Sequence, residues 1–456
     1  MMDTATAARI VDGRVVGSSV RFLRVTTDSR TLRAGDLFVA LSGERFDGHD
    51  FVPAALAQGA AAALVARERA DTIAGALIAV DDPLAALGRL AAHWRAQFTL
   101  PLALIVGSNG KTTAKEMLAS ILRAHFGEAA VLATEGNLNN AIGLPLTLLR
   151  LNASHRAAAI ELGMNHRGET RELASVAQPT IVVVNNAQRE HQEFMASVAD
   201  VAAEHADAVT SLCRGGVAVI NADDAHAGVW RAAAATAGAQ VVTFGLESAA
   251  DVSAQVRPRA DGSALDIATP AGRVQVSLAI PGRHMARNAL AATAAALAAG
   301  ASIDAVTGGL AAFRAVPGRL VAVHATSGAL VLDDTYNANP DSMRAAIDVL
   351  AASPGTRFLV MGDMGEVGAA GPAFHREIGG YARDRGIVRL YALGELVRES
   401  VAAFGAGAAH FGSVEALVDQ LRNDAEAGVT VLVKGSRFMR MERVVAALTG
   451  TAGGGH

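Results

Sequence analysis

Residues 107–113, GSNGKTT, have the composition of a phosphate-binding loop and directly follow the apolar run Leu102–Val106. Glycines let backbone N–H groups approach phosphate oxygens, and the N-terminus of a following helix adds the positive end of its dipole. We therefore expect Lys111 to neutralise the β- and γ-phosphates of a nucleotide and the Thr112 hydroxyl to bind magnesium. The predicted phosphate-binding set is Gly107, Ser108, Asn109, Gly110, Lys111, Thr112 and Thr113.

The spacing of the two glycines departs from the general motif. That motif has four residues between its glycines, whereas this chain has two. The prediction therefore depends on context, because the loop follows a strand pattern and opens a helix pattern.

Lysine is rare in this chain. There are three, Lys111, Lys115 and Lys434, and the other basic side chains are arginines. A compact ammonium group and a planar guanidinium are not interchangeable. We therefore predict that Lys111 and Lys434 carry chemistry. The alternative, survival by chance, is weaker for Lys111 than for Lys434.

Two residues could complete a magnesium site, since this ion needs further oxygen or nitrogen ligands. Glu161 ends the apolar run AAAIEL, and His191 lies in NNAQREHQEF beyond the run TIVVVNN. The alternatives are a solvated loop carboxylate and an ordinary loop histidine. The predicted metal set is Thr112, Glu161 and His191, and the predicted catalytic set is Lys111, Glu161 and His191.

Three further segments carry more polar side chains than a turn or a helix cap requires. They are TEGNLNNAIGLPLTLL at 134–149, DDTYNANPDSM at 333–343 and VLVKGSRFMRME at 431–442. The last two follow strand patterns, where an anion such as a carboxylate or phosphate could be held. A nucleotide-binding block followed by a second ligand-binding block suggests that two substrates are joined with ATP. The polar residues concerned are Thr134, Glu135, Asn137, Asn139, Asn140, Asp334, Tyr336, Asn337, Asn339, Lys434, Ser436 and Arg437.

The elements that must position these residues alternate short apolar strands with helices. This pattern predicts a parallel sheet covered on both faces, in the middle of the chain and again near its end. The beginning of the chain is mixed. Breaks near 97–101 and 314–318 predict three domains, 1–98, 99–315 and 316–456. The expected fold class is α/β: a mixed α/β N-terminal domain, a central P-loop-type parallel-sheet domain and a C-terminal Rossmann-like domain.

The composition narrows the class of protein. The 456 residues are 51% hydrophobic and 18% charged, with a net charge of -4, so no broad basic surface invites nucleic acid or an anionic membrane. The single cysteine, Cys213, predicts a reducing cytoplasm. We expect no signal peptide and no membrane span, because the most apolar segment, 289–301, is too short. No feature predicts an oligomer, so we expect a monomer.

Together these motifs resemble the Mur ligases, ATP-dependent amide ligases that build the peptidoglycan peptide. The resemblance rests on the GxxGKT loop, Glu161, PGRHMARNALAA, VPGR and the third α/β block, and it covers nearly the whole chain. EGNLNNAIGLPLTLL, DDTYNANPDSM, GDMGEVG and VKGSRFMRME are similar to the members that add D-alanyl-D-alanine to UDP-N-acetylmuramoyl-tripeptide. The members that add the third residue have different loops, with histidine in place of the NAN segment. The resemblance thus implies these two substrates, with ATP and Mg²⁺ as cofactors; diaminopimelate and lysine both stay open as the tripeptide's third residue.

The resemblance also implies roles for single residues. The first block would hold the uridine diphosphate end of the nucleotide substrate. Asn288 is similar to an adenine-side asparagine, and Arg319 and Asp334 to nucleotide contacts that are completed when the C-terminal domain closes. The implied substrate-binding residues are Asp28, Ser29, Arg30, Ser42, Asp47, His49, Thr134, Asn137, Asn140, Tyr336, Asn337, Lys434, Ser436 and Arg437.

One departure from the family concerns a lysine that many members carry after the metal-binding histidine, modified to a carbamate that supports a second magnesium. The stretch MASVADVAAEHADAV has His205 there, beside Glu204 and Asp207, and no lysine. We hypothesise that His205 or Glu204 supports the metal through water, or that the second site is weaker. The alternative is that this helix face is solvated surface. Other functional readings are a related ligase with another acyl acceptor and a nucleotide-binding protein without turnover.

Overall fold

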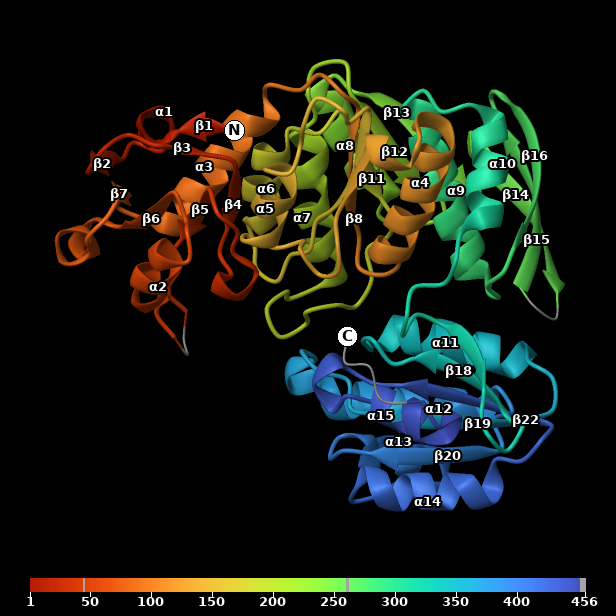
Figure 1. Ribbon diagram of the computed structural model, residues 1–456. Coiled ribbons are helices and arrows are strands. Elements are labelled where there is room, and N and C mark those ends of the chain that lie inside the picture. The colour runs from red at the N-terminus through yellow and green to blue at the C-terminus, as the bar shows by residue number, and fades with distance from the viewer. Residues whose placement is uncertain (44–45, 260–261, 452–456) are drawn as a thin grey trace.

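The computed structural model describes residues 1–43, 46–259 and 262–451. Within these residues the strands form four sheets, of two, five, six and nine strands. Figure 1 shows an N-terminal part beside a central part, with a C-terminal part below the central one. Each of the three larger sheets lies within one of the predicted blocks, whose exact boundaries stay a prediction. No helix among these residues is long and apolar enough to cross a membrane.

The N-terminal part is built on the five-stranded sheet, in the order β2-β7-β6-β5-β4. Strand β2 is antiparallel to β7, and the other pairs are parallel. The elements are β1 (Met2–Asp3), α1 (Thr4–Ile10), β2 (Arg14–Val16), β3 (Arg21–Phe22), β4 (Arg24–Thr26), β5 (Asp36–Val39), α2 (Val52–Ala57), β6 (Ala62–Ala66), β7 (Leu77–Val80) and α3 (Pro83–Arg95), with 3-10 turns at Ser29–Thr31, Gly48–Phe51 and Arg67–Thr72.

The central part contains the nine-stranded sheet, in the order β16-β15-β14-β13-β12-β11-β8-β10-β9. Strands β9 to β14 run parallel, and β15 and β16 extend the sheet as an antiparallel ribbon that the sequence patterns did not predict. The elements are β8 (Leu102–Val106), α4 (Lys111–Phe126), β9 (Val131–Ala133), α5 (Gly143–Leu148), β10 (Ala157–Glu161), α6 (Glu169–Ala177), β11 (Ile181–Val184), α7 (Val198–Thr210), β12 (Val217–Asn221), α8 (Ala227–Ala237), β13 (Gln240–Gly245), β14 (Val252–Arg259), β15 (Gly262–Thr269), β16 (Gly272–Leu278), α9 (Arg283–Ala298) and α10 (Ile303–Ala312), with a 3-10 turn at Glu128–Ala130.

The C-terminal part has the six-stranded sheet, in the order β17-β18-β22-β19-β20-β21, parallel except for β17. Helix α11 begins at Pro340, where proline is tolerated, after Asn339 in a capping box with Ser342. The elements are β17 (Val321–His324), β18 (Leu330–Asp334), α11 (Pro340–Ala352), β19 (Thr356–Gly362), α12 (Gly371–Asp384), β20 (Arg389–Leu393), α13 (Val397–Phe404), β21 (Ala408–Phe411), α14 (Val414–Asp424), β22 (Val429–Lys434) and α15 (Glu442–Thr449), with 3-10 turns at Gly368–Ala370 and Arg437–Met439. The predicted α/β class, with two largely parallel sheets, is confirmed.

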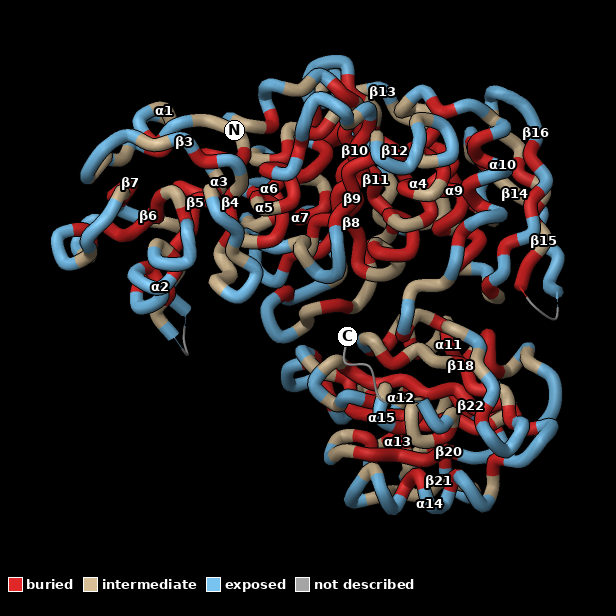
Figure 2. Tube along the Cα trace, viewed as in Figure 1, coloured by how far each residue is buried: buried red, intermediate tan, exposed pale blue. Residues whose placement is uncertain are grey.

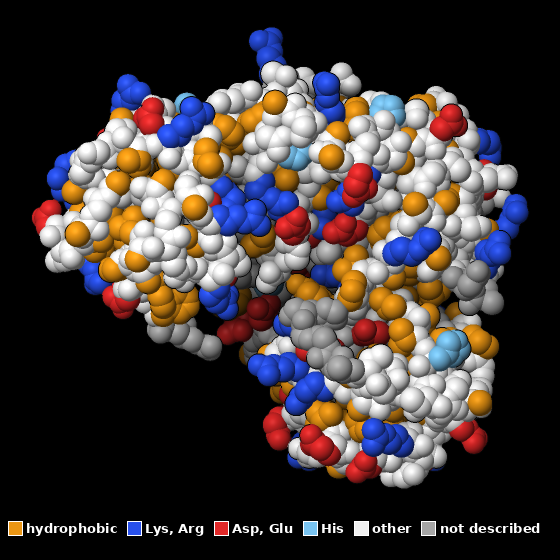
Figure 3. All heavy atoms as spheres, viewed as in Figure 1, with side chains coloured by type: hydrophobic (Ala, Val, Ile, Leu, Met, Phe, Trp, Pro, Cys, Tyr) orange, Lys and Arg blue, Asp and Glu red, His pale blue; other side chains and the backbone are white. Residues whose placement is uncertain are grey.

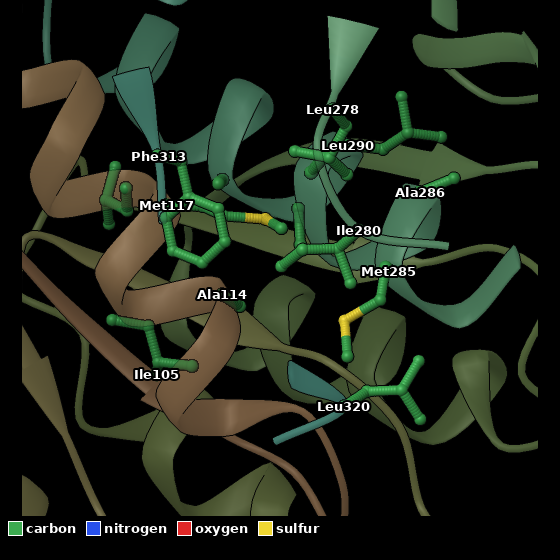
Figure 4. Packing of buried hydrophobic residues seen from close by; sticks show 14 of the residues in the cluster. Ile105, Ala114, Met117, Leu278, Ile280, Met285, Ala286, Leu290, Phe313 and Leu320 are labelled. Atoms are coloured by element: carbon green, nitrogen blue, oxygen red, sulfur yellow. The ribbon is translucent and has the colours of Figure 1, made fainter. Parts of the chain in front are cut away.

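The apolar run of β8 is buried on both faces of the sheet, as expected for a central parallel strand. Ala103 and Ile105 pack on the face covered by α4 and α9, whereas Leu102, Leu104 and Val106 pack on the opposite face. Figure 2 shows the central strands β8, β10 and β11 of this sheet buried along their length. Figure 4 shows the core on the face covered by α4 and α9, in which Met117, Leu290, Ile280 and Phe313 meet. The strand that leads into residues 107–113 is therefore held from both sides.

Strand order decides which loops meet. Strands β11, β8 and β10 are neighbours and parallel, so the segments after Val184, Val106 and Glu161 leave the same edge of the sheet. Strands β18, β22 and β19 are likewise neighbours, which brings together the segments after Asp334, Lys434 and Gly362. Ligands of open parallel sheets bind at such carboxyl ends.

Two neighbouring glycines of helix α10 allow the packing of the central part to be tested. Gly309 faces α4, where an added Cβ would lie 2.4 Å from the Cα of Ile121, whereas Gly308 faces open space. We expect Gly309→Ala to lower the free energy of unfolding by about 1 to 3 kcal/mol through overpacking. Gly308→Ala on the same helix should raise it by roughly 0.5 to 1 kcal/mol, because alanine favours helix. Scanning calorimetry would measure both, and shifts of the same sign would contradict this packing.

Candidate active site

A cavity of about 980 Å³ lies between the central and C-terminal parts. Its walls come from the strand-end segments of both sheets, namely residues 108–113, 161–165, 186–191, 334–342 and 434–438, with residues of α9. Figure 3 shows the surface indented between the N-terminal and C-terminal parts, with acidic and basic side chains on its borders. One cavity therefore contains most of the residues that the sequence marked.

The phosphate loop requires both of its glycines. Gly107 and Gly110 have positive φ, 140° and 80°, and Gly110 caps α4. A Cβ on Gly110 would lie 2.5 Å from Oδ1 of Asn288, and one on Gly107 would lie 2.9 Å from the Cβ of Asn185. Backbone conformation and space thus both exclude a side chain. Asn288, predicted on the adenine side, lies against this loop and accepts a hydrogen bond of 2.9 Å from Asn185 Nδ2.

Lys111 begins α4 and turns back over its own loop. Its Nζ donates to the carbonyls of Gly107 and Ser108 and lies 3.5 Å from Oε2 of Glu190. Glu190 is buried, and the sequence analysis did not select it. Burial alone would raise the pKa of Glu190, but the charges of Lys111, His205 and His191 outweigh this effect and lower the pKa to about 2. Its carboxylate is therefore ionised at neutral pH.

Glu161 lies at the end of β10, where the sequence predicted it. Its Oε1 accepts a hydrogen bond of 2.7 Å from Asn139 Nδ2, and its backbone N–H donates to the Thr134 hydroxyl at 2.9 Å. Its Oε2 is buried and has no hydrogen-bond partner within the described ranges. Such an orphaned oxygen in a cavity wall shared with Thr112 and His191 fits a magnesium site.

His191 has a left-handed backbone, with φ 48°, and its Nδ1 lies 2.6 Å from Oε2 of Glu366 in the C-terminal part. Nowhere in the described residues do three His, Cys, Asp or Glu side chains already form a metal cluster. Magnesium binds few protein groups and completes its shell with phosphate oxygens and water. Thr112, Glu161 and His191 thus fit the ion as separate contributors, and this assignment stays a prediction.

In the C-terminal wall, Lys434 and Ser436 hold the segment that follows β18. Lys434 Nζ donates to the carbonyl of Asn337 at 2.8 Å and lies 2.7 Å from Asp334 Oδ2. Ser436 Oγ donates to the carbonyl of Ala338 at 3.1 Å and accepts from Gly365 N–H at 2.7 Å. These two residues shape the wall while their side chains line it.

Three other predicted residues of this wall form a stack. The guanidinium of Arg319 lies 4.1 Å above the ring centre of Tyr336, and that of Arg437 lies 5.9 Å from it. All three line the cavity, as does Asn337. The stack thus places two positive charges in the lining of the same cavity as the phosphate loop.

His284, which the sequence analysis did not select, also lines the cavity near Asp334 and Lys434. Burial lowers the pKa of His284 to about 4, although Asp334 opposes the shift. The ring is therefore neutral at pH 7. Its place in PGRHMARN, one helical turn before Asn288, was the available signal.

The polar residues of the segment after β9 make several different contacts. Asn137 and Asn140 both line the cavity, and Asn140 Oδ1 also accepts hydrogen bonds from the N–H groups of Ile142 and Gly143 at the start of α5, at 3.2 and 2.9 Å. The Thr134 hydroxyl accepts from Glu161 N–H, and its carbonyl accepts from the buried Lys115 at 2.6 Å. Asn139, which holds Glu161, is the residue of this segment that bears most directly on the metal site. Lys115 is thus used to anchor this segment.

The predicted uridine-diphosphate residues lie in the N-terminal part, outside the lining of the large cavity. His49 is buried with both ring nitrogens used: Nδ1 lies 2.5 Å from Asp47 Oδ1, and Nε2 accepts from Ala66 N–H at 2.9 Å. Hydrogen bonds from His49 and Ser42 lower the pKa of Asp47 to about 2. His49 therefore positions this loop, which leaves Ser42 and Asp47 nearer to solvent. Asp28 similarly caps the turn that contains Ser29 and pairs with Arg30 at 2.9 Å.

The helix that carries His205 bears on one of the two interpretations made from the sequence, while metal support by His205 or Glu204 stays a prediction. Glu204 and His205 are buried, so the prediction of a solvated face is wrong for them. The Glu204 carboxylate accepts hydrogen bonds of 3.0 and 2.9 Å from Gly168 and Thr170 at the N-terminus of α6, and Asp207 pairs with Arg171 at 2.7 Å. His205 Nε2 lies 3.5 Å from Oε1 of Glu190, and Glu190 lines the cavity.

Comparison with known proteins bears on the whole chain. Family models described as "Mur ligase family, catalytic domain", "Mur ligase middle domain" and "Mur ligase, glutamate ligase domain" match residues 22–95, 105–296 and 318–437. The UDP-N-acetylmuramoyl-tripeptide--D-alanyl-D-alanine ligase of Escherichia coli is 41% identical over 443 residues, 96% of either chain. The chain belongs to the Mur ligase family. The predicted resemblance is confirmed.

Solved structures support the same assignment. A MurF structure from Acinetobacter baumannii has a TM-score of 0.91 at 32% identity and covers 99% of both chains. The MurF ligase of Thermotoga maritima in complex with ADP has a TM-score of 0.82 at 26% identity and covers 94% of this chain and 97% of that one. This Mur ligase thus has the predicted three-domain α/β architecture.

The central and C-terminal parts of this Mur ligase are joined by an ion-pair cluster. Arg189, two residues before His191, lies 2.6 Å from Asp341 of α11 and 2.6 Å from Glu377 of α12. Burial opposes the charge of Arg189, but its hydrogen bonds to both carboxylates raise the pKa of its guanidinium further. Asn109 of the phosphate loop and Asn339 also exchange amide hydrogen bonds, at 2.8 and 3.3 Å. The contacts between the parts therefore start from the loops that form the phosphate site.

We expect Arg189→Gln to weaken this contact by about 1 kcal/mol, because its exposed fraction keeps the pair partly screened. That corresponds to a roughly fivefold larger fraction of molecules in which the central and C-terminal parts have separated. Distance distributions between fluorophores on the two parts would measure it. Arg344→Gln is the matched control, because Arg344 pairs with the same Glu377 from within the C-terminal part, at 3.1 Å. Identical distributions for wild type and Arg189→Gln would contradict the role.

Proposed function

We propose that this protein joins D-alanyl-D-alanine to UDP-N-acetylmuramoyl-tripeptide, with conversion of ATP to ADP and phosphate. The product is the pentapeptide precursor of peptidoglycan. The observation that supports this most is the shared cavity, which places the phosphate loop opposite the NAN and KGS segments. The relative named for this reaction in Escherichia coli aligns along 96% of the chain.

The reaction has two steps. The terminal carboxylate of the tripeptide attacks the γ-phosphorus of ATP, and ADP leaves, which gives an acyl phosphate. The amine of D-alanyl-D-alanine then attacks the acyl carbon, phosphate leaves, and the amine loses a proton as the amide forms. Catalysis of this kind consists mostly of positioning and charge stabilisation.

The chain supplies these through its own side chains. Lys111 turns from the loop carbonyls to the β- and γ-phosphates, and the N-terminus of α4 adds backbone donors. Thr112, Glu161 and His191 would hold Mg²⁺, which neutralises phosphate charge when bound. Neutral His284 and the stack of Arg319 on Tyr336 line the cavity on the nucleotide side, and neither adds negative charge. Asn288 and Asp334 complete the nucleotide contacts.

Closure of the C-terminal part keeps water from the acyl phosphate. In this structure Arg189 and the Asn109–Asn339 pair hold the parts together. The dipeptide would enter beside Tyr336, Asn337 and Arg437, on a wall kept in place by Lys434 and Ser436. The N-terminal part would hold the uridine diphosphate through the loops of Asp28, Ser29, Arg30, Ser42 and Asp47. We place the reaction in the cytoplasm, where ATP is available.

The first test measures phosphate release from ATP and Mg²⁺, with the two co-substrates supplied singly and together. We expect release only with both, and a product heavier by the dipeptide in mass spectrometry. Release with the tripeptide nucleotide and another amine, but not with D-alanyl-D-alanine, would mean a ligase with a different acceptor. Nucleotide binding without release under any condition would mean a protein without turnover.

A lysine substitution tests the phosphate loop. We expect Lys111→Met to lower kcat by about 10² to 10³-fold, the usual effect of removing one group that stabilises transition-state charge. Binding of the uridine nucleotide should stay the same, because its loops lie outside the cavity. Arg123→Gln in the last turn of the same helix, where Arg123 pairs with Glu128 at 3.1 Å, is the control and should keep normal turnover. A Lys111→Met enzyme with unchanged kcat would contradict the assignment.

A further inference from the structure

Glu190 lies in the wall of the active-site cavity, and His205 lies directly behind it. Glu190 is a lining residue of the cavity, in the segment between β11 and α7. His205 belongs to α7, and its side chain is only 2% exposed. The distance from His205 Nε2 to Glu190 Oε1 is 3.5 Å. The imidazole therefore backs a carboxylate that faces the nucleotide site.

Both side chains have unused hydrogen-bonding atoms. Within the described residues, Oε1 of Glu190 and both ring nitrogens of His205 are buried without a hydrogen-bond partner. Buried polar groups are nearly always paired in folded proteins, so each exception needs an explanation. Oε2 of Glu190 lies 3.5 Å from Lys111 Nζ and 3.8 Å from His191 Nε2. Glu190 thus lies between Lys111 and His191, which have roles in the proposed mechanism, and His205, which has none.

The nucleotide changes the charge balance around Glu190. In the proposed reaction Lys111 turns to the phosphates, so the carboxylate loses its strongest cation. A buried carboxylate without a counter-charge is costly, and one facing phosphate oxygens is more so. A divalent cation between carboxylate and phosphate removes both penalties.

We propose that Glu190 is a further magnesium-facing carboxylate of this active site and that His205 is the residue that positions it. Glu161 approaches from β10, and Glu190 from the segment after β11, so the two carboxylates reach the cavity from strands on either side of β8. The proposal rests on the proposed function, because it needs the nucleotide to draw Lys111 away. The competing account is that Glu190 only restrains Lys111 while His205 remains its counter-ion, with no metal involved.

Metal binding distinguishes these accounts independently of turnover. Mn²⁺ is titrated into the enzyme with a non-hydrolysable ATP analogue, free Mn²⁺ is followed by electron paramagnetic resonance, and a titration of the analogue alone is subtracted. We expect Glu190→Gln, which keeps the shape and removes the charge, to weaken Mn²⁺ binding by about tenfold or more. Glu193→Gln, an exposed carboxylate of the same segment, should bind like wild type. Affinity for Mn²⁺ within about twofold of the Glu193→Gln control would overturn the proposal.

Variants of His205 test the positioning role. His205→Phe should weaken Mn²⁺ binding by about tenfold, and His205→Gln, which keeps an N–H donor, should restore most of it. In the Glu190→Gln background, His205→Phe should have no further effect, because the two residues act as one unit. Equal losses in both backgrounds would overturn the link between them. Thermal unfolding of each variant, and its affinity for ADP, identify any variant that has failed to fold.

A second measurement follows from the chemistry of the group. The carboxylate of Glu190 is part of the chain, and α7 contains no lysine that could carry a carbamate. Phosphate release should therefore be equal in buffer stripped of carbon dioxide and in buffer with added bicarbonate. A rate that depends on bicarbonate would overturn the proposal. Failure of the wild-type enzyme to release phosphate with both co-substrates would instead count against the proposed function, whatever the Mn²⁺ titrations give.

Discussion

The active site depends on the hydrogen bonds between the phosphate loop and the segment that follows β11. Gln188 N–H donates to Ser108 Oγ at 2.8 Å, and Asn109 N–H donates to Asn186 Oδ1 at 2.8 Å. These bonds hold the loop against this segment and use the N–H of Asn109, so the N-terminus of α4 supplies the donors expected for phosphate. The same segment continues to Arg189, Glu190 and His191. Phosphate binding, metal binding and contact with the C-terminal part are therefore set by one short stretch of chain.

The placement of these residues in one stretch of chain bears on the contact between the central and C-terminal parts. Arg189, which pairs with Asp341 of the C-terminal part, is adjacent in the chain to Gln188, which binds Ser108, and is two residues from His191. The pairs that make this contact are charged and partly exposed, so they can break and re-form as substrates enter and leave. An apolar interface of the same size would release its partner less readily. The chemistry of the contact is therefore compatible with the domain closure proposed above.

The rare lysines show how differently one residue type can be used. Lys111 is in the phosphate loop, and Lys434 holds the opposite wall through Asp334 and Asn337. Lys115 is fully buried and anchors the carbonyl of Thr134. An ammonium and a guanidinium present different hydrogen-bond geometries, so arginine would not reproduce these contacts. The scarcity of lysine in the sequence thus marked structure as well as chemistry.

The sequence alone determined the phosphate loop, the strand-end Glu161, the parallel sheets and the family, because these depend on short runs whose residue types have one physical meaning. It also selected Lys434, Asn337 and Arg437, which the structure places in the lining of the cavity. It could not separate Asn139 from Asn140, since a helix cap and a carboxylate partner are both asparagines, and only the fold shows which side chain faces Glu161. Nor could it select Glu190 or His284, or decide between His205, which lies against Glu190, and Glu204, which binds the start of α6. Their roles arise from distances between segments on different strands and helices, and such distances are properties of the packed chain.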